Sequence, residues 1–285
     1  MKLAVWALIA IYSFSRVLQV FPGPFPMVAV VALHVVPPAI FAWIHGATAY
    51  GWRAMLVFFA VCLAVGNVFE NSGVRTGFPF GHYNFTGLMG PKVLDVPIML
   101  GMAYVGMAYL AWTMARLILG DAGRPLSGSR IATVPLVAGF LMTAWDFSMD
   151  PVWSTILHAW VWRDGGSYFG VPVSNFLGWY FTVFCFYQLF ALYLKGREVR
   201  RELAPGYWRT PVVFYAVSAA GNLLLAIPRP GPPVVSDAAG VVWRVSDITG
   251  ACVLVSIFVM GAFALIAWVR SRERDYLTMG QSPVS

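Results

Sequence analysis

The chain has 285 residues, of which 59% are hydrophobic and 11% are charged, and its formal net charge is +7. Soluble domains contain about 25% charged residues, so this composition excludes an ordinary water-exposed globule. The apolar residues come in blocks of about 20, the length of a helix that crosses the hydrocarbon core of a bilayer. The sequence therefore predicts an all-α integral membrane protein with one transmembrane domain, residues 1–285, built as a bundle of about eight helices.

The first block could be a transmembrane span or a signal peptide, because Lys2 followed by an apolar run is typical of both. Arg16 interrupts the run and no cleavage site with small residues follows it, so we interpret the block as a retained span. In chain order the predicted spans are Leu3–Phe21, Phe25–Ile44, Ala54–Glu70, Val96–Leu119, Ile131–Met149, Asn175–Leu194, Pro211–Ile227 and Ile248–Val269.

Basic residues divide unevenly between the two sides of this topology. With the N-terminus in the cytoplasm, six of the 19 Lys and Arg residues fall on the outer side and the others on the inner side. This bias follows the positive-inside rule, so the basic charge indicates orientation and not a nucleic-acid partner. We expect a multi-pass protein of the cell membrane with both termini in the cytoplasm. The outer six are Arg16, Arg75, Lys92, Arg163, Arg229 and Arg244.

The two longest outer connections, Ser72–Asp95 and Pro151–Ser174, mix Gly and Pro with aromatic residues and carry few charges. They are too apolar for solvated linkers and too broken by Gly and Pro to span a membrane. Non-helical backbone at membrane depth is tolerated where it packs on protein or lines a cavity. We therefore expect two aromatic caps folded over the outer mouth of the bundle.

Three polar residues end the third span on one helical face. Asn67, Glu70 and Asn71 are spaced i, i+3 and i+4. An ionisable residue inside a membrane segment is costly and by default suggests a function. Apolar surroundings favour the neutral form of a carboxyl group, which would make Glu70 a proton donor oriented by the two amides. The structural alternative is a hydrogen-bonded helix end that holds the cap loop.

Two more carboxylates, Asp146 and Asp150, lie i, i+4 at the end of the fifth span, next to Trp145. Two carboxyl groups on one face can share a proton and so provide an acid and a base, and the Trp145 ring could stabilise a nearby cation. One structural alternative is a salt bridge to Arg75 or Arg163. The other is a helix end stopped by the proline after Asp150, although acids are disfavoured at a helix C-terminus.

Asp95 precedes the fourth predicted span and Asn175 begins the sixth, so both fit an N-cap as well as a site residue. The four histidines and three cysteines show no metal-ligand spacing, and each cysteine falls inside a predicted span. The sequence also has no HExxH motif, no phosphate-binding glycine loop and no dinucleotide fingerprint. We therefore expect neither a metal nor a cofactor.

Four segments resemble the membrane carotenoid-biosynthesis hydratases, the family of bisanhydrobacterioruberin hydratase and γ-carotene 1′-hydratase. They read ENSGVRTGFPFGHYNF, VPIMLGMAY, WDFSMDPV and GGSYFGVPVSNFLGW, in this order between Glu70 and Trp179. The resemblance implies cofactor-independent addition of water to the terminal C=C bond of an acyclic or monocyclic carotenoid end group, which gives a tertiary alcohol. It also implies a lipid-soluble carotenoid substrate, contact with membrane lipids, and other enzymes of the carotenoid pathway as partners.

This chemistry needs a carboxylic acid to protonate the alkene, a carboxylate to activate water, and aromatic faces to shelter the tertiary cation. We expect the catalytic residues to be Asp146, Asp150 and Glu70. The residues expected to contact the substrate are Asn67, Asn71, Tyr83, Asp95, Trp145 and Asn175.

Three other functions stay open. A lycopene-type cyclase protonates the same kind of alkene but excludes water, and the motifs alone do not separate it from a hydratase. An intramembrane prenyltransferase of the UbiA type would need a second acidic motif beside Asp146-x-x-x-Asp150, and the sequence has none. A proton-coupled carrier also uses buried acids, but we see no inverted repeat, and the acids lie near one surface.

Overall fold

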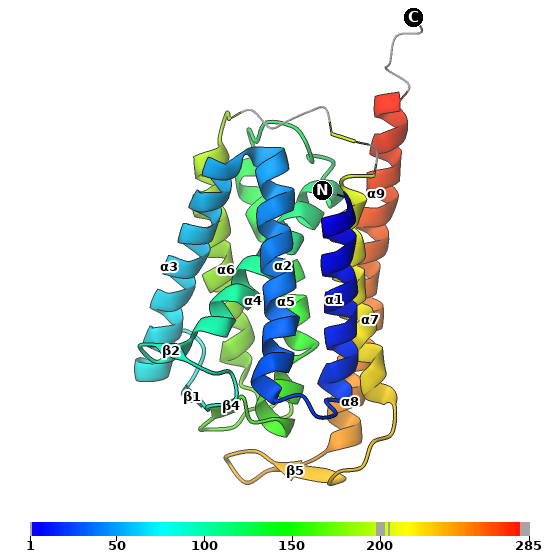
Figure 1. Cartoon of the computed structure of the whole chain (residues 1–285). Coiled ribbons are helices and arrows are strands. Elements are labelled where there is room, and N and C mark those ends of the chain that lie inside the picture. The colour runs from blue at the N-terminus through cyan, green and yellow to red at the C-terminus, as the bar shows by residue number, and fades with distance from the viewer. Residues whose placement is uncertain (1, 198–202, 205, 280–285) are drawn as a thin grey trace, which may run out of the picture.

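The structure is a computed structural model that describes residues 2–197, 203–204 and 206–279. Its helices run side by side as one bundle (Figure 1). In chain order they are α1 (Lys2–Val20), α2 (Met27–Tyr50), α3 (Trp52–Thr76), α4 (Ile98–Ile118), α5 (Arg130–Phe147), α6 (Val173–Leu194), α7 (Arg209–Asn222), α8 (Val245–Val255) and α9 (Gly261–Met279).

The predicted helical membrane bundle is confirmed. Within the described residues, seven helical segments are long and apolar enough to cross a membrane, and a π-helical turn, η3 (Ser256–Met260), joins α8 and α9 into one of them. The predicted seventh span is occupied by α7, which has only 14 residues, and by the 3-10 turn η2 (Leu223–Ala226). Although short, α7 packs between α1 and α9 and crosses the bundle, so α1 begins at the end where α9 finishes (Figure 1).

The core of the bundle is α4, whose apolar stretch is 78% buried, compared with 28% for α3 and for the α8–α9 segment. Small residues allow neighbouring helices to approach it closely, as is usual in membrane bundles. At Gly106 an added Cβ would lie 2.8 Å from the Cβ of Pro38 and 2.9 Å from the amide nitrogen of Ala39 on α2. The α2–α4 contact therefore depends on the missing side chain.

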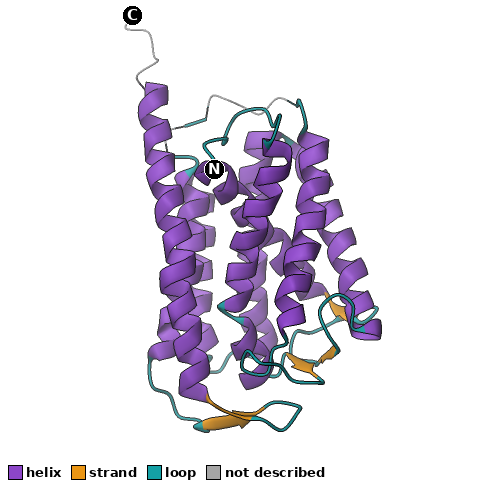
Figure 2. Ribbon diagram, turned by 180° about the vertical axis from the view of Figure 1, so that it is seen from behind, coloured by secondary structure: helices purple, strands orange, loops and turns teal. Residues whose placement is uncertain are grey.

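Short strands gather at one end of the bundle, which we call the cap end (Figure 2). Strand β1 (Tyr83–Phe85) pairs antiparallel with β4 (Trp160–Trp162), so the two expected caps form one layer. Strands β2 (Lys92–Val93) and β3 (Val96–Pro97) lead into α4. A further hairpin of β5 (Val234–Ser236) and β6 (Val242–Arg244) lies at the same end, and the sequence did not predict it.

The fifth span continues beyond its predicted end at Met149. After α5 a turn at Ser148 and Met149 leads into helical Asp150 and Pro151 and then into a π-helical turn, η1 (Val152–Ile156). Pro151 keeps a helical φ of −62°. Because a π turn already breaks the regular ladder of i→i−4 bonds, it accommodates a residue without an N–H. The structural alternative in which this proline stops the helix is not observed, because Asp150 lies inside a continuous helical segment, Arg130–Ile156.

Candidate functional site

Three carboxylates from two helical segments meet below the caps. Glu70 on α3 is 3% exposed, and Asp146 and Asp150 on the α5–η1 segment are each 1% exposed. Asn175, in the first turn of α6, joins the two aspartates. Its Nδ2 donates to Asp146 Oδ2 at 3.0 Å and to Asp150 Oδ2 at 2.7 Å. We call these four residues the acid cluster.

The two aspartates have different surroundings. Asp150 Oδ1 accepts hydrogen bonds from the indole N–H groups of Trp160, at 2.9 Å, and Trp162, at 3.4 Å. Both rings reach the same carboxylate because residues two apart on a strand point to the same face. Asp146 Oδ1, by contrast, is buried without a hydrogen-bond partner. Since donated hydrogen bonds favour the charged form, the surroundings of Asp150 suit a carboxylate and those of Asp146 suit a neutral acid.

Glu70 is held by two tyrosine hydroxyls. Tyr104 on α4 donates to Oε1 at 2.5 Å, and Tyr83 on β1 donates to Oε2. The Tyr104 ring stacks on Trp179 of α6, with centroids 4.7 Å apart and planes 3° apart. Burial, together with the adjacent Glu70, raises the pKa of the Tyr83 phenol, so this group remains a donor. Glu70 is thereby fixed between a cap strand and the central helix.

A small cavity opens between Glu70, Asp150 and Asn175. Its volume is about 20 Å³, and we call it the acid cavity. That space holds about one water molecule. Asp146 does not line the acid cavity. It can influence a molecule bound there only through its hydrogen bond to Asn175, which also binds Asp150. Aromatic rings make up most of the remaining wall: Phe80, Tyr83, Phe85, Trp160, Trp162 and Trp179.

Four of the residues predicted to contact substrate do not line this cavity, and three of them, Asn67, Asn71 and Asp95, contact one another. Asn71 Nδ2 donates to Asn67 Oδ1 at 3.0 Å, and Asn71 Oδ1 accepts from the amide nitrogen of Asp95 at 3.1 Å. Asp95 also pairs with Arg75 at 2.8 Å, with both side chains substantially exposed. These contacts anchor the segment before α4 to α3, which matches the structural alternative considered for Asn67 and Asn71.

Trp145 is buried on another side of the acid cluster. Its ring lies 6.2 Å from Trp179, and it lines a narrow seam with Tyr12 and His34 instead of the acid cavity. The salt-bridge alternative for the aspartates is also not observed. In the part of the chain that the structure describes, no ion pair joins Asp146 or Asp150 to a basic side chain.

Sequence reasoning missed Tyr104, Trp160, Trp162 and Trp179. Tyr104 and Trp179 lie in apolar spans, where an aromatic ring is ordinary packing material. Trp160 and Trp162 lie in an expected cap, where residues 160–162 form β4. The alternation Trp-Val-Trp was the available signal, since two like residues separated by one other share a strand face.

A second buried polar cluster surrounds Arg16 on α1, which is 3% exposed. Its guanidinium donates to Gln19 Oε1 at 2.5 Å and to Asn222 Oδ1 on α7, and it lies 3.1 Å from Nε2 of His34. Asn222 continues the network to Ser148, at 3.0 Å between Nδ2 and Oγ. Among the described residues no carboxylate forms an ion pair with Arg16, so neutral groups alone solvate it.

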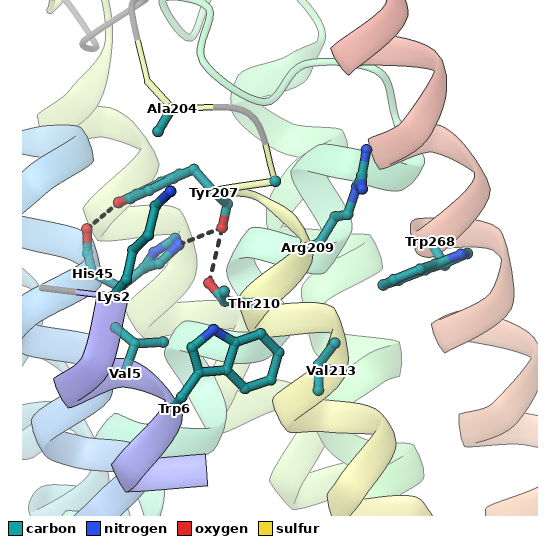
Figure 3. A pocket seen from close by; sticks show the side chains of 11 residues that line it. Lys2, Val5, Trp6, His45, Ala204, Tyr207, Arg209, Thr210, Val213 and Trp268 are labelled. Carbon is teal, nitrogen blue, oxygen red and sulfur yellow. Dashed lines mark hydrogen bonds between the residues drawn. The ribbon is translucent and has the colours of Figure 1, made fainter.

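A larger cavity of about 340 Å³ lies at the opposite end of the bundle, between α1, α7 and α9 (Figure 3). Lys2 and Arg209 supply its charged groups, and Trp6 and Trp268 supply much of its apolar wall. Both ring nitrogens of His45 are engaged, Nδ1 with the Tyr109 hydroxyl at 2.6 Å and Nε2 with the backbone oxygen of Tyr207 at 3.1 Å. Among the described residues that line this cavity there is no carboxylate, in contrast to the acid cavity at the cap end.

The described residues contain no group of three or more His, Cys, Asp or Glu side chains that could hold a metal ion. The acid cluster supplies carboxyl and amide groups, and the residues around it supply phenol and indole groups. Such a set can donate a proton, accept a proton and orient a water molecule. Its rings can also stabilise a cation within the cavity.

The fold and this acidic, aromatic site belong to a membrane protein of a defined class: the chain is a member of the carotenoid biosynthesis protein family, whose sequence profile matches residues 25–241. A curated relative is the bisanhydrobacterioruberin hydratase of Haloarcula japonica. It is 29% identical over 138 residues, which cover 47% of this chain and 44% of the relative. The chain thus matches less than half the length of that relative. No solved structure matches the chain.

Proposed function

We propose that this protein adds water to the terminal C=C bond of a carotenoid end group. The observation that carries the proposal is the acid cavity, in which two carboxyl groups face a space of about one water molecule inside an aromatic wall. Membership of a carotenoid biosynthesis family and the similarity to a bisanhydrobacterioruberin hydratase support the same chemistry.

Charge balance suggests the roles of the acids. Among the described residues no cation pairs with the three carboxyl groups, and several buried negative charges without partners would be very costly. Asp150, with three side-chain donors, is best suited to be ionised. Glu70, which also lines the cavity but accepts from only two side-chain donors, then acts as the neutral proton donor, and Asp150 acts as the base. Asp146 is a positioning residue that reaches Asp150 through Asn175.

The reaction balances in two steps. The Glu70 carboxyl O–H gives its proton to the less substituted alkene carbon, and the π electrons form the new C–H bond, which leaves a tertiary cation. A water oxygen then forms the C–O bond, and its proton passes to Asp150. Transfer of a proton from Asp150 back to Glu70 restores the starting state. The faces of Trp160, Trp162 and Trp179 would stabilise the cation between the two steps.

The substrate must displace part of the wall, because an isoprenoid end group is far larger than a cavity of about 20 Å³. A carotenoid dissolved in the bilayer would enter sideways between helices. We expect aromatic side chains at the cavity to change rotamer when it binds.

The proposal is tested by expressing the chain in a host that accumulates an acyclic carotenoid and separating the pigments by chromatography. A product heavier by one water supports the hydratase. A product of unchanged mass but altered spectrum indicates a cyclase, and unchanged pigment contradicts both. Cells that express Asp150→Asn at the same membrane level serve as the control.

A further inference from the structure

A second cavity lies beside the acid cavity at the cap end, and the proposed mechanism does not yet use it. Its volume is about 250 Å³, enough for several water molecules. Ser154, Thr155 and His158 line it on one side, and Ser236 and Asp237 of the β5–β6 hairpin line it on the other. His158 and Ser236 are exposed, so the cavity communicates with the outside of the cap end. We call it the vestibule.

One strand separates the vestibule from the acid cavity. On β4 Val161 lines the vestibule, whereas Trp160 lines the acid cavity, in agreement with the alternation of side chains along a strand. Trp162 lines both cavities. Trp162 is thus the residue that the two spaces share, and its indole N–H donates to Asp150 Oδ1 at 3.4 Å.

The helix side of the vestibule is also tied to the acid cluster. The Ser154 hydroxyl donates to the backbone oxygen of Asp150 at 2.8 Å, one helical turn away. The backbone oxygen of Ser154 lies 3.1 Å from Nδ1 of His158. A polar lining therefore continues from the exposed rim to the residue that we assign as the base.

We propose that the vestibule supplies water to the acid cavity and that the Trp162 indole is the barrier that this water must pass. The inference rests on the hydratase function proposed above. Hydration consumes one water per turnover, and an end group that arrives from the bilayer closes the apolar side of the cavity. Water from the vestibule would reach the cation on the Asp150 side, where its oxygen forms the C–O bond and its proton passes to Asp150.

The first experiment needs no activity and uses single cysteines in a full-length chain with Cys62, Cys185 and Cys252 changed to Ala. A small water-soluble thiosulfonate is the probe. Ser236→Cys, at the exposed rim of the vestibule, should react readily. Met149→Cys, in the acid cavity, should react slowly, and its rate should rise about tenfold or more when Trp162→Ala is added, because a rare opening becomes a permanent path.

The matched control is Trp160→Ala, which also removes a ring and an N–H donor from the acid cavity but does not line the vestibule. It should leave the Met149→Cys rate low. If Trp162→Ala does not accumulate in membranes, Trp162→Phe gives the same comparison with a smaller opening. The proposal is overturned if Ser236→Cys is unreactive. It is also overturned if the Met149→Cys rate is insensitive to Trp162 variants or equally sensitive to Trp160→Ala.

The second experiment blocks the vestibule without touching the acid cavity. Ala238 lines the vestibule on the exposed turn of the hairpin, so Ala238→Trp should fill it. Val242 on β6 is 60% exposed and does not line it, so Val242→Trp is the control. In heavy water we expect Ala238→Trp to lower hydrated product several-fold and to raise deuterium in carotenoid that was protonated but not hydrated.

Equal hydration by the Ala238→Trp and Val242→Trp proteins contradicts the water route. The two proposals fail in different ways. If the unaltered chain yields no hydrated carotenoid while the thiosulfonate pattern is as expected, the result supports the water path and contradicts the hydratase assignment. If hydration is found but the thiosulfonate pattern is absent, the hydratase stands and water reaches the cavity elsewhere.

Discussion

At the scale of single residues, the main feature of this protein is a set of buried acids that no base neutralises. In the described chain, phenol, indole and amide donors take the place of cations around Glu70, Asp146 and Asp150. Such donors can support about one negative charge, and the remaining acids must hold protons. A bound proton next to an ionised carboxylate is the requirement for acid–base catalysis.

The first prediction separates the three acids. Glu70→Gln and Asp150→Asn each remove a group that faces the cavity, so the rate of hydration should fall by about 10²–10⁴-fold. Asp146→Asn replaces a neutral acid that does not face the cavity with an amide of the same shape, so its loss should be about tenfold or less. The measurement is product formed per amount of inserted protein.

The control is Asp164→Asn, since the Asp164 side chain is 75% exposed and pairs with His82 away from the acid cluster. Its rate should match that of the unaltered chain. If Asp146→Asn strongly lowers the rate of hydration and Glu70→Gln leaves it near normal, Asp146 is the proton donor and Glu70 is the positioning residue. Near-normal activity in all three acid variants would show that the catalytic site lies elsewhere in the molecule.

At the scale of elements, the sequence predicted the spans because hydrophobic length is a local property. It also located Glu70, Asp146 and Asp150, since a charge in an apolar run is costly wherever the chain folds. The pairing of β1 with β4 was not predictable in this way. It joins Tyr83 to Trp162, and no local pattern specifies partners so far apart in the chain. The donors to Asp150 depend on that pairing, so they were missed with it.

The α2–α4 contact gives the second prediction. Gly106→Ala places a Cβ 2.8 Å from Pro38, on a helix made stiff by Pro37 and Pro38, so the two helices must separate. Overpacking of this kind typically costs about 1–3 kcal/mol. We expect a lower midpoint of thermal unfolding in detergent. Gly250→Ala on α8 is the matched control, because nothing lies within 4 Å of its added Cβ. Equal midpoints for the two variants would show that the contact is not tight.

At the scale of the whole molecule, the bundle has two different ends. The cap end carries the strands, the acid cavity and the vestibule, and the opposite end carries the 340 Å³ cavity with Lys2 and Arg209. Most Lys and Arg residues of the chain belong to the second end in the topology predicted from sequence. From the positive-inside rule we propose that the caps lie outside the cytoplasm.

The third prediction tests this orientation. Gly123 lies between α4 and α5, and Gly165 lies after β4 at the cap end, so the two loops are at opposite ends of the bundle (Figure 1). A reporter that is active only in the cytoplasm should work when inserted at Gly123 and fail at Gly165. A reporter active only outside should show the reverse. The opposite pattern would show that the protein has the reverse orientation in the membrane. Activity of one reporter at both positions would contradict the span assignment.

The most direct measurement of the central claim is the source of the oxygen atom in the product. Membranes that contain the chain are incubated with an acyclic carotenoid in oxygen-18 water, with air removed, and the pigments are analysed by mass spectrometry. We predict a tertiary alcohol that carries the heavy oxygen and forms without molecular oxygen, and its amount should fall with Glu70→Gln. An unlabelled hydroxyl group, a product of unchanged mass, or no product from the unaltered chain would contradict the hydratase account.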